Sequence, residues 1–393
     1  MTEVRGLLSP GFLVINLQFA LVTAIAAQFF AFAGYLQLAG IDPRSVGLIL
    51  SADALAALII QPLIAPFIRA GNARRWLVGG SLLLAAALMM LTQVTSVVLL
   101  IGVRLLQGAG FICVLSALIA LVVRFIPPAM SGRAFGWISL VRLIPYALIP
   151  FFFDLFSISS SSFPSLLHAA ALVALLPALM LLLPAARRQD EDELPFSPGL
   201  AGMIMSLRSP AVAMLLLSAL LFFCGYAAVF FYLKEFIVAQ SIGSNSLFFT
   251  TATLMMIAVR LLGSGLFDRC SKVWLCAAGL LLVSVSYALL PLCTGQRELI
   301  LLAGTTGIGW GIVMPLQAAA MFDLSLPADR AMNQNLLVVT MQGGFFLGPV
   351  IGGQLLACGQ FGLLFFVLAG LTLVASLITF CLRTQHSDAP NIG

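Results

Sequence analysis

Long apolar runs alternate with short polar stretches along the whole chain, and this alternation predicts a series of membrane-spanning helices. A helix needs about 20 apolar residues to cross a bilayer. Charged residues and turns rich in Gly, Pro or Asn divide the chain into runs of about that length. The expected spans are 11–38, 45–68, 76–94, 97–123, 134–157, 164–184, 211–233, 244–267, 273–292, 299–322, 332–356 and 361–382.

The most polar stretch, residues 184–210, lies almost at the midpoint of the chain. It combines the acidic run 190–193 with several arginines and prolines. Such a segment is too polar to be buried and too rich in proline to form one helix. It is interpreted as an exposed connector, which predicts an N-terminal half 1–186, a connector 187–210 and a C-terminal half 211–393.

Composition points to lipid as the solvent of this chain. Hydrophobic residues make up 62% and charged residues 8%, whereas a soluble domain carries about 25% charged residues. The net charge of +5 is scattered over loops, so no nucleic-acid partner is expected. The seven cysteines are an odd number and lie mostly within apolar runs, where they act as small hydrophobes, so no metal or cofactor is expected.

The first apolar run resembles a secretory signal over residues 1–27, with Arg5 at its start. The run continues to Ala39, however, which favours a retained first span over a cleaved signal.

Basic residues predict how the helices are oriented, because cytoplasmic loops are enriched in Lys and Arg. With the N-terminus inside, most basic loop residues fall on the cytoplasmic side: Arg5, Arg69, Arg74, Arg75, Arg124, Arg133, Arg187, Arg188, Arg208, Arg269, Lys272, Arg330 and Arg383. The outer loops hold only Arg44, Lys234 and Arg297. Both termini and the connector are therefore expected in the cytoplasm, in an inner (plasma) membrane protein.

The two halves repeat one another. Landmark residues recur about 200 positions apart: Arg69 with Arg269, Pro127 with Pro327, Arg133 with Arg330, and Pro150 with Pro349. The expected fold is thus an all-α membrane protein of twelve transmembrane helices in two pseudo-symmetric six-helix halves. In transporters built from such repeats the binding site lies between the halves, near the membrane midplane.

Three motifs resemble those of the major facilitator superfamily, in particular its drug and metabolite exporters. Arg104–Gly110 (RLLQGAG) resembles the RxxQGxG motif of proton antiporters. Arg260–Arg269 resembles the signature at the cytoplasmic end of span eight, and Gly344–Gly353 (GFFLGPVIGG) resembles the exporter pattern of span five. The resemblance covers all twelve spans and implies the major facilitator fold with alternating access.

Two positions depart from the family pattern. The loop after span two has Ile68-Arg69 where an Asp-Arg pair is usual, and span five keeps Pro150 but no glycine in Pro145–Phe153. These departures weaken the assignment to drug antiport.

The span-eleven motif and the end of span eight are candidate moving parts. Gly344 and Gly348 lie four residues apart and give a helix face without side chains, while Pro349 kinks the helix. The alternative is static packing of small residues. Asp268, followed by Arg269, stands where a carboxylate could pair with a neighbouring helix N-terminus or arginine and latch the cytoplasmic side; otherwise it is a solvated loop charge.

Ionisable residues within spans are costly and mark functional sites. Asp53 and Arg104 both lie roughly 10–12 Å below the outer surface, so an ion pair is possible, with Asp53 as a proton site and Arg104 in contact with substrate. The alternative is a fixed structural pair.

A second pair of charged positions is Arg142 and Arg260, which lie at similar depth from the cytoplasmic side, with no acid near either in sequence. They are candidates for anion recognition; otherwise each reaches water or bonds backbone carbonyls. Tyr232 is a further candidate for lining the pathway.

These features predict a secondary transporter that exports a small organic molecule by proton antiport. The arginines favour an anionic or carboxylate-bearing substrate, such as an organic acid or a carboxylate siderophore. Proton-coupled uptake and efflux of lipophilic drugs are alternatives, and a polytopic membrane enzyme is a less favoured class because no acid/base or metal cluster is evident. No GxxxxGK[ST] motif is present, so ATP is not expected to drive transport. The expected partners are substrate, protons and lipid, and the protein is expected to be a monomer.

Overall fold

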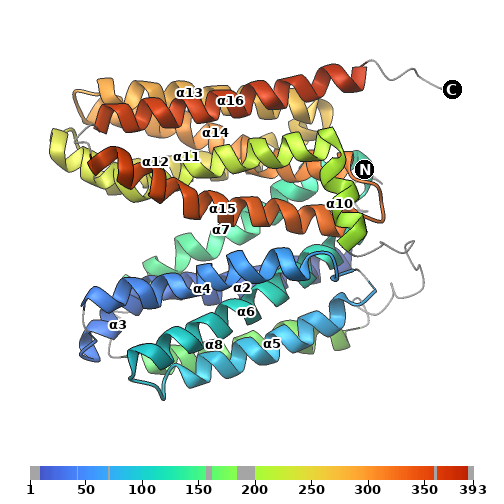
Figure 1. Ribbon diagram of the computed structural model, residues 1–393, viewed down its shortest axis with the longest axis vertical. Helices are drawn as coiled ribbons and strands as arrows, with labels where there is room; N and C mark the ends of the chain where they lie inside the picture. The colour runs from blue at the N-terminus through green and yellow to red at the C-terminus, as the bar shows by residue number, and fades with distance from the viewer. Residues whose placement is uncertain are drawn as a thin grey trace. The chain divides into compact units, whose positions relative to one another are not determined.

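The predicted spans appear as long helices in the computed structural model, which describes residues 9–41, 43–69, 71–155, 162–183, 200–357 and 361–387 (Figure 1). The first span consists of α2 (Pro10–Ala27), a 3₁₀ turn η1 (Gln28–Ala31) and α3 (Phe32–Leu38). The other helices of the N-terminal half are α4 (Pro43–Ile64), α5 (Ala73–Met90), α6 (Val97–Val122) with η2 (Val123–Phe125), α7 (Ser131–Leu155) after the turn η3 (Pro128–Met130), and α8 (Phe163–Leu179) with η5 (Met180–Leu182).

The C-terminal half repeats this order. It contains α11 (Pro210–Gln240), α12 (Asn245–Arg269), α13 (Lys272–Leu289) with η6 (Leu290–Leu292), α14 (Gln296–Leu324), α15 (Arg330–Ala357) and α16 (Phe361–Ser387). Within the described residues, each of the twelve predicted spans coincides with one of these helices or with helices in direct succession. The predicted all-α, twelve-helix fold is confirmed.

The connector contains a helix that the sequence analysis does not anticipate. Its first part, residues 184–199, lies outside the described residues, but Leu200–Arg208 forms α10. No proline stands between Pro198 and Pro210, so these residues are free to make helical hydrogen bonds.

Most of the helices are apolar enough to cross a membrane. Among the described residues, nine helices have the length and hydropathy of a span, and Leu48–Ile64 of α4 and Leu247–Gly263 of α12 are shorter apolar segments. The helix α7 is absent from both groups, and it carries Arg133 and Arg142 within its 25 residues.

The chain forms two compact units. Unit 1 comprises Met1–Pro127, Leu140–Met203 and Pro327–Asn335, and unit 2 comprises Pro128–Ser139, Ile204–Leu326 and Leu336–Gly393. Unit 2 therefore includes the first turns of α7, and unit 1 includes the start of α15.

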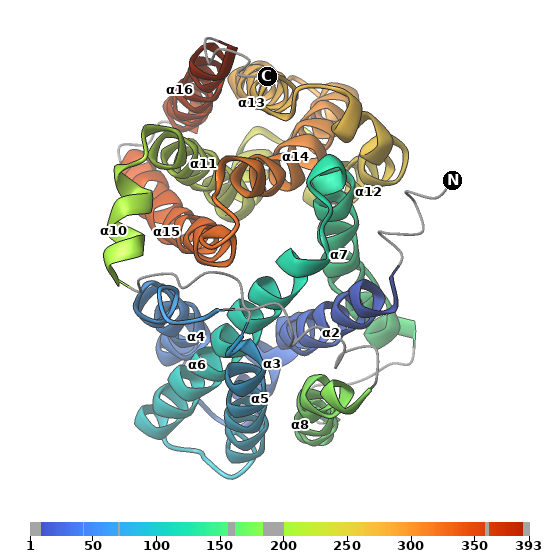
Figure 2. The ribbon, with the colours of Figure 1, turned by 90° about the vertical axis from the view of Figure 1, so that its right-hand side faces the viewer.

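Helices pair in the same way within each unit, as Figures 1 and 2 show. In unit 1, α6 packs against α2, α4 and α5, and α8 packs against α2 and α5. In unit 2, α14 packs against α11, α12 and α13, and α16 packs against α11 and α13. Each of these five contacts in one unit thus has its counterpart in the other, which is the pseudo-symmetry expected from the repeated landmarks.

Glycines set the closest of these helix contacts at equivalent positions. A Cβ on Gly108 of α6 would lie 2.5 Å from the carbonyl oxygen of Asp53 in α4, and one on Gly307 of α14 would lie 2.3 Å from that of Ala252 in α12. Two residues later, Gly110 meets α5 and Gly309 meets α13 in the same manner. Only a residue without a side chain allows two helix backbones to approach so closely.

We expect Gly108→Ala to lower the free energy of unfolding by about 1–3 kcal/mol, because the added methyl group meets the backbone of α4 and must push the helices apart. The matched control is Gly102→Ala in the same helix, where an added Cβ meets nothing within 4 Å. That control should leave stability unchanged or raise it by up to about 1 kcal/mol through helix propensity. Denaturant unfolding in micelles measures both, and equal effects of the two substitutions would contradict this account of the contact.

Candidate functional site

A buried guanidinium group ties α6 to α4 in unit 1. Arg104 is 2% exposed and forms an ion pair of 2.7 Å between Nη2 and Oδ1 of Asp53. Its Nε donates to the carbonyl of Ile49 at 3.2 Å, its Nη2 to that of Leu50 at 3.1 Å, and its Nη1 to Oε1 of Gln107 at 2.6 Å. All three nitrogens of the guanidinium thus have acceptors, as a buried cation requires.

Aromatic rings complete the surroundings of Arg104. Its guanidinium lies 4.6 Å from the ring centroid of Phe29 and 5.4 Å from that of Phe32, distances at which the ring faces attract a cation. Its partner Asp53 has a side chain that is 38% exposed. The arginine is therefore enclosed, with each of its three guanidinium nitrogens bonded within the protein, whereas the carboxylate keeps an accessible side.

Arg142 lies in different surroundings, although it belongs to the same unit. The side chain is half-buried in α7, and its guanidinium lies 5.9 Å from the ring centroid of Phe19 in α2. Tyr146, one turn further along α7, lies within electrostatic range of both Arg142 and Asp53. Among the described residues, no carboxylate lies within salt-bridge distance of Arg142.

Arg260 is 4% exposed in α12. Its Nη1 donates to the carbonyl of Ser139 at 3.0 Å and its Nη2 contacts the sulfur of Met314 at 3.4 Å. The backbone bond corresponds to the structural alternative considered for this residue. Arg142 and Arg260 belong to different units, so their joint recognition of one anion stays a prediction.

The glycine face of α15 packs against α11. A Cβ on Gly344 would lie 2.4 Å from Cβ of Phe223, and one on Gly348 would lie 2.4 Å from the carbonyl oxygen of Cys224. Tyr232, predicted to line the pathway, donates its hydroxyl to the carbonyl of Pro349 at 2.7 Å. Tyr232 thus helps to hold α11 on α15 beside the proline; its part in substrate binding and the movement of α15 stay predictions.

Asp268 at the end of α12 meets the N-terminus of α7. Its Oδ1 accepts from the backbone N–H of Arg133 at 3.1 Å, and its Oδ2 lies 3.7 Å from Nε of the same residue. A Cβ on Gly132 would lie 2.8 Å from the carbonyl oxygen of Phe267, so the glycine permits this approach. Burial raises the pKa of Asp268, against the opposing influence of the Arg133 backbone, Lys272 and the Arg133 side chain.

The family assignment follows from sequence and fold together. The sequence model of the Major Facilitator Superfamily matches residues 14–325 and, a second time, residues 235–392. The chain belongs to the major facilitator superfamily. As such it is a membrane transporter and not an enzyme, which confirms the predicted family and class.

Solved structures of major facilitator transporters share the fold over nearly the whole chain. The fucose:proton symporter FucP of E. coli is 17% identical with a TM-score of 0.74, covering 96% of this chain and 99% of that chain. The human organic anion transporter MFSD10 is 16% identical with a TM-score of 0.74, covering 94% and 99%. A bacterial homologue of the iron transporter ferroportin is 13% identical with a TM-score of 0.80, covering 95% and 99%. No curated protein sequence matches significantly.

A second polar cluster in this major facilitator chain was missed by sequence reasoning. Lys272 donates to Oδ2 of Asp323 at 2.6 Å and to the hydroxyl of Ser131 at 2.7 Å, and Ser131 donates to Oδ1 of Asp323 at 2.7 Å. Ser131 begins α7 beside Arg133. A signal was available in the sequence. Lys272 follows the predicted span 244–267 and Asp323 follows 299–322, and both spans are expected to end on the same side of the membrane, so a basic and an acidic residue could meet there.

Replacing Asp268 by alanine should lower the free energy of unfolding by about 1–2 kcal/mol, because α7 loses an acceptor at its N-terminus. The neighbouring Arg269 provides the control, since it is exposed and its side chain makes no ion pair or hydrogen bond with the described residues. Arg269→Ala should change stability by no more than about 0.5 kcal/mol. Denaturant unfolding of the two variants and the wild type tests this, and a neutral Asp268→Ala would show that the contact contributes nothing.

Proposed function

We propose that this transporter carries a small organic anion coupled to protons. The proposal rests on two charged side chains of unit 1. Asp53 is a carboxylate with an accessible side, and Arg142 is a cation with no carboxylate at salt-bridge distance among the described residues. Tyr146 lies within electrostatic range of both. A proton acceptor and an anion-binding group are the two components that such coupling needs.

Asp53 is the proton-carrying group of this proposal. Arg104 holds one of its oxygens by a 2.7 Å ion pair, while 38% of the side chain stays exposed. A carboxylate that is fixed in position but reachable by water can load and release a proton in each cycle. Arg104 acts here as a positioning residue because each of its guanidinium nitrogens already has a partner within the protein.

Arg142 is the anion-binding group. Half-burial makes an unneutralised guanidinium costly, and a bound carboxylate offsets this cost through two parallel hydrogen bonds. The exposed ring of Tyr146, 51% accessible, offers a hydroxyl for the same substrate. Organic acids and carboxylate siderophores meet these requirements. The fold is compatible with such cargo, since MFSD10 is described as an organic anion transporter.

Electrostatics favours transport of the proton and the anion together. An ionised Asp53 repels an anion at Arg142, and protonation removes this repulsion, so each ligand strengthens binding of the other. This reciprocity is what a symporter uses. Export by antiport is the second candidate, favoured by the exporter-like motifs Arg104–Gly110 and Gly344–Gly353, and it requires the opposite sign of coupling.

The contact of Asp268 with the start of α7 is proposed as a latch that closes the transporter on the side of the membrane where most of the basic loop residues lie. By the distribution of basic residues this side is cytoplasmic, in an inner (plasma) membrane with both termini inside. Alternating access needs contacts that form in one state and break in the other. The hydrogen bond to the Arg133 backbone and the bonds of Ser131 with Lys272 and Asp323 are candidates for such contacts, since they join the start of α7 to α12, α13 and α14.

Asp53→Asn should tighten binding of the anion by roughly tenfold at a pH where Asp53 is ionised, because asparagine mimics the protonated acid and removes about 1–2 kcal/mol of repulsion. Accumulation driven by a pH gradient should be lost, while downhill exchange of substrate continues. Binding to purified protein and flux in proteoliposomes measure the two effects.

Glu298→Gln is the control for this prediction, since this carboxylate bonds Thr294 at the start of α14 and should alter neither binding nor coupling. Weaker anion binding in Asp53→Asn would favour antiport over symport. Unchanged accumulation against the gradient would remove Asp53 from the coupling mechanism altogether.

Arg142→Lys should weaken anion binding by roughly tenfold, since lysine keeps the charge but cannot form the paired hydrogen bonds, and Arg142→Gln should weaken it further. Arg260→Lys is the comparison. If Arg260 serves only the carbonyl of Ser139, its replacement should lower stability and leave affinity within about twofold. Titration of citrate and of a quaternary ammonium ion distinguishes anion from cation transport; preferential binding of the cation, with Arg142→Lys behaving as wild type, would refute the proposed substrate class.

A further inference from the structure

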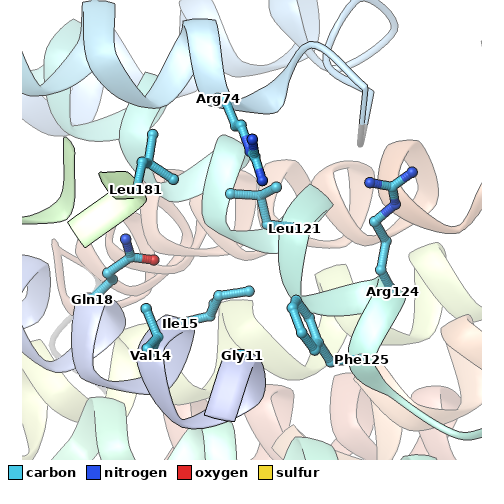
Figure 3. Close-up of a pocket in the computed structure, with 9 residues that line it drawn as sticks. All are labelled: Gly11, Val14, Ile15, Gln18, Arg74, Leu121, Arg124, Phe125 and Leu181. Carbon is cyan, nitrogen blue, oxygen red and sulfur yellow. The ribbon is translucent and has the colours of Figure 1, made fainter. Parts of the chain in front are cut away.

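Helix α10 (Leu200–Arg208) carries an exposed surface that the transport of a substrate does not explain. The pocket in Figure 3 is of another kind, because its two arginines, Arg74 and Arg124, already interact with other groups of the chain. Helix α10 stands immediately before α11, the first span of the C-terminal half, and only Ser209 separates the two helices. From Ile204 onward it belongs to the same compact unit as α11.

The direction of α10 differs from that of the span that follows. Figures 1 and 2 both show α10 running across the N-terminal end of α11. The backbone of Ser209 is extended (φ −66°, ψ 117°) and Pro210 follows it, because a proline disfavours the helical conformation of the residue before it. Helix α11 has the length and hydropathy of a membrane span over Pro210–Leu233. A helix that runs across the end of such a span lies along the membrane surface.

The side chains of α10 are arranged in the reverse of the order found on a water-facing helix. The residues turned toward the protein are small, since Ser206 is 7% exposed and Gly202 is buried. The large apolar residues point outward, with Met205 68%, Ile204 45% and Leu207 42% exposed. A helix on the surface of a soluble protein buries its apolar side and exposes its polar side. The arrangement in α10 therefore suits apolar surroundings.

The lipid bilayer is the apolar phase next to this surface. Single exposed apolar side chains are common on proteins, but here Ile204, Met205 and Leu207 form one patch on a short helix. The patch lies about one helical turn before α11, whose own outward side chains, such as Leu217 at 48% exposed, face lipid. A helix in this place can insert its apolar side at the boundary between headgroups and acyl chains.

Arg208 gives the same surface a group for the lipid headgroups. It is exposed in the last turn of α10, four positions after Ile204 and hence on the same side of the helix. Its aliphatic stem can lie along the apolar patch while its guanidinium reaches a phosphate. A cation is also favourable at a helix C-terminus. Helix α10 contains no acidic residue, so nothing within it repels an anionic lipid.

We propose that α10 is an interfacial helix whose partner is the lipid surface of the leaflet in which α11 begins. Ile204, Met205 and Leu207 enter the boundary between headgroups and acyl chains, and Arg208 binds the phosphate of an anionic lipid. A helix of 9 residues binds a membrane weakly by itself, but its attachment to a span keeps it at the surface at high effective concentration. The last part of the connector is thus fixed to the membrane beside α11.

The test places the photoreactive residue p-benzoylphenylalanine at position 205 of the full-length protein, in liposomes of phosphatidylethanolamine and phosphatidylglycerol. Irradiation joins this residue to the molecule that lies against it, and mass spectrometry identifies the adduct. Position 217 of α11 is the lipid-facing control, and Arg297, an exposed residue in the first turn of α14, gives the background. We expect the yield of lipid adduct at position 205 to be about half of that at 217 or more, and about fivefold above that at 297.

Ile204, exposed on the same side of α10, receives the same replacement in a second variant, so the result does not depend on one variant keeping its fold. The proposal is overturned if the main adduct at these two positions is a second copy of the chain, which would make α10 an interface between copies. A yield of lipid adduct equal to the background at position 297 also overturns it.

The role of Arg208 is tested with the photoreactive residue kept at position 205. Arg208→Gln should lower the ratio of phosphatidylglycerol to phosphatidylethanolamine adducts by about two- to fivefold, because one basic residue near the surface is lost. Arg269→Gln is the matched control, since Arg269 is also exposed in the last turn of its helix, and it should leave the ratio within about twofold. A ratio that Arg208→Gln does not change would contradict the contact with anionic lipid.

Discussion

A guanidinium group inside an apolar helix bundle must have its N–H groups satisfied by protein, and in unit 1 this constraint fixes how α4 and α6 pack. The carbonyls of Ile49 and Leu50 are available to Arg104 because Gly108 lets the two backbones approach. The approach and the hydrogen bonds therefore depend on one another. The result is that Asp53, three residues beyond Leu50 in α4, is held at a fixed place with its carboxylate partly accessible.

The same close approaches recur in unit 2 without the charges. Gly307 and Gly309 of α14 meet α12 and α13 as Gly108 and Gly110 meet α4 and α5, but the position equivalent to Arg104 is Ala303, which is buried. The glycine contacts therefore belong to the fold and suffice to pack these helices. The ion pair is an addition made in one half only, and a costly one, which is why we assign it to the transport mechanism and not to folding.

The helices were predictable from sequence because hydropathy and length determine which segments cross a membrane. The predicted span 97–123 agrees with α6 and η2 almost residue by residue. For Asp268 the sequence predicted only the kind of partner, a helix N-terminus or an arginine. The particular partner is the backbone N–H of Arg133, which lies far away in sequence and is reached only because Gly132 lets the helices approach. The cluster of Ser131, Lys272 and Asp323 was not predicted, since three elements distant in sequence meet there. Helix α10 was missed because residues 184–210 were treated as one proline-rich segment, although no proline stands between Pro198 and Pro210, where the helix forms.

Arg142 and Arg260 show why depth in a span does not decide the role of a charge. Sequence places the two alike, but Arg260 is 4% exposed and bonds the carbonyl of Ser139, whereas Arg142 lies beside the ring of Phe19 and within electrostatic range of Tyr146. A helical carbonyl has a second lone pair and can accept a side-chain donor without breaking its helix. The protein has thus given Arg260 a backbone acceptor at little cost and left Arg142 with aromatic neighbours that attract a cation only weakly. An arginine that already has a backbone acceptor gains less from a bound anion than one that faces rings, and this difference is why we propose Arg142 as the anion-binding residue.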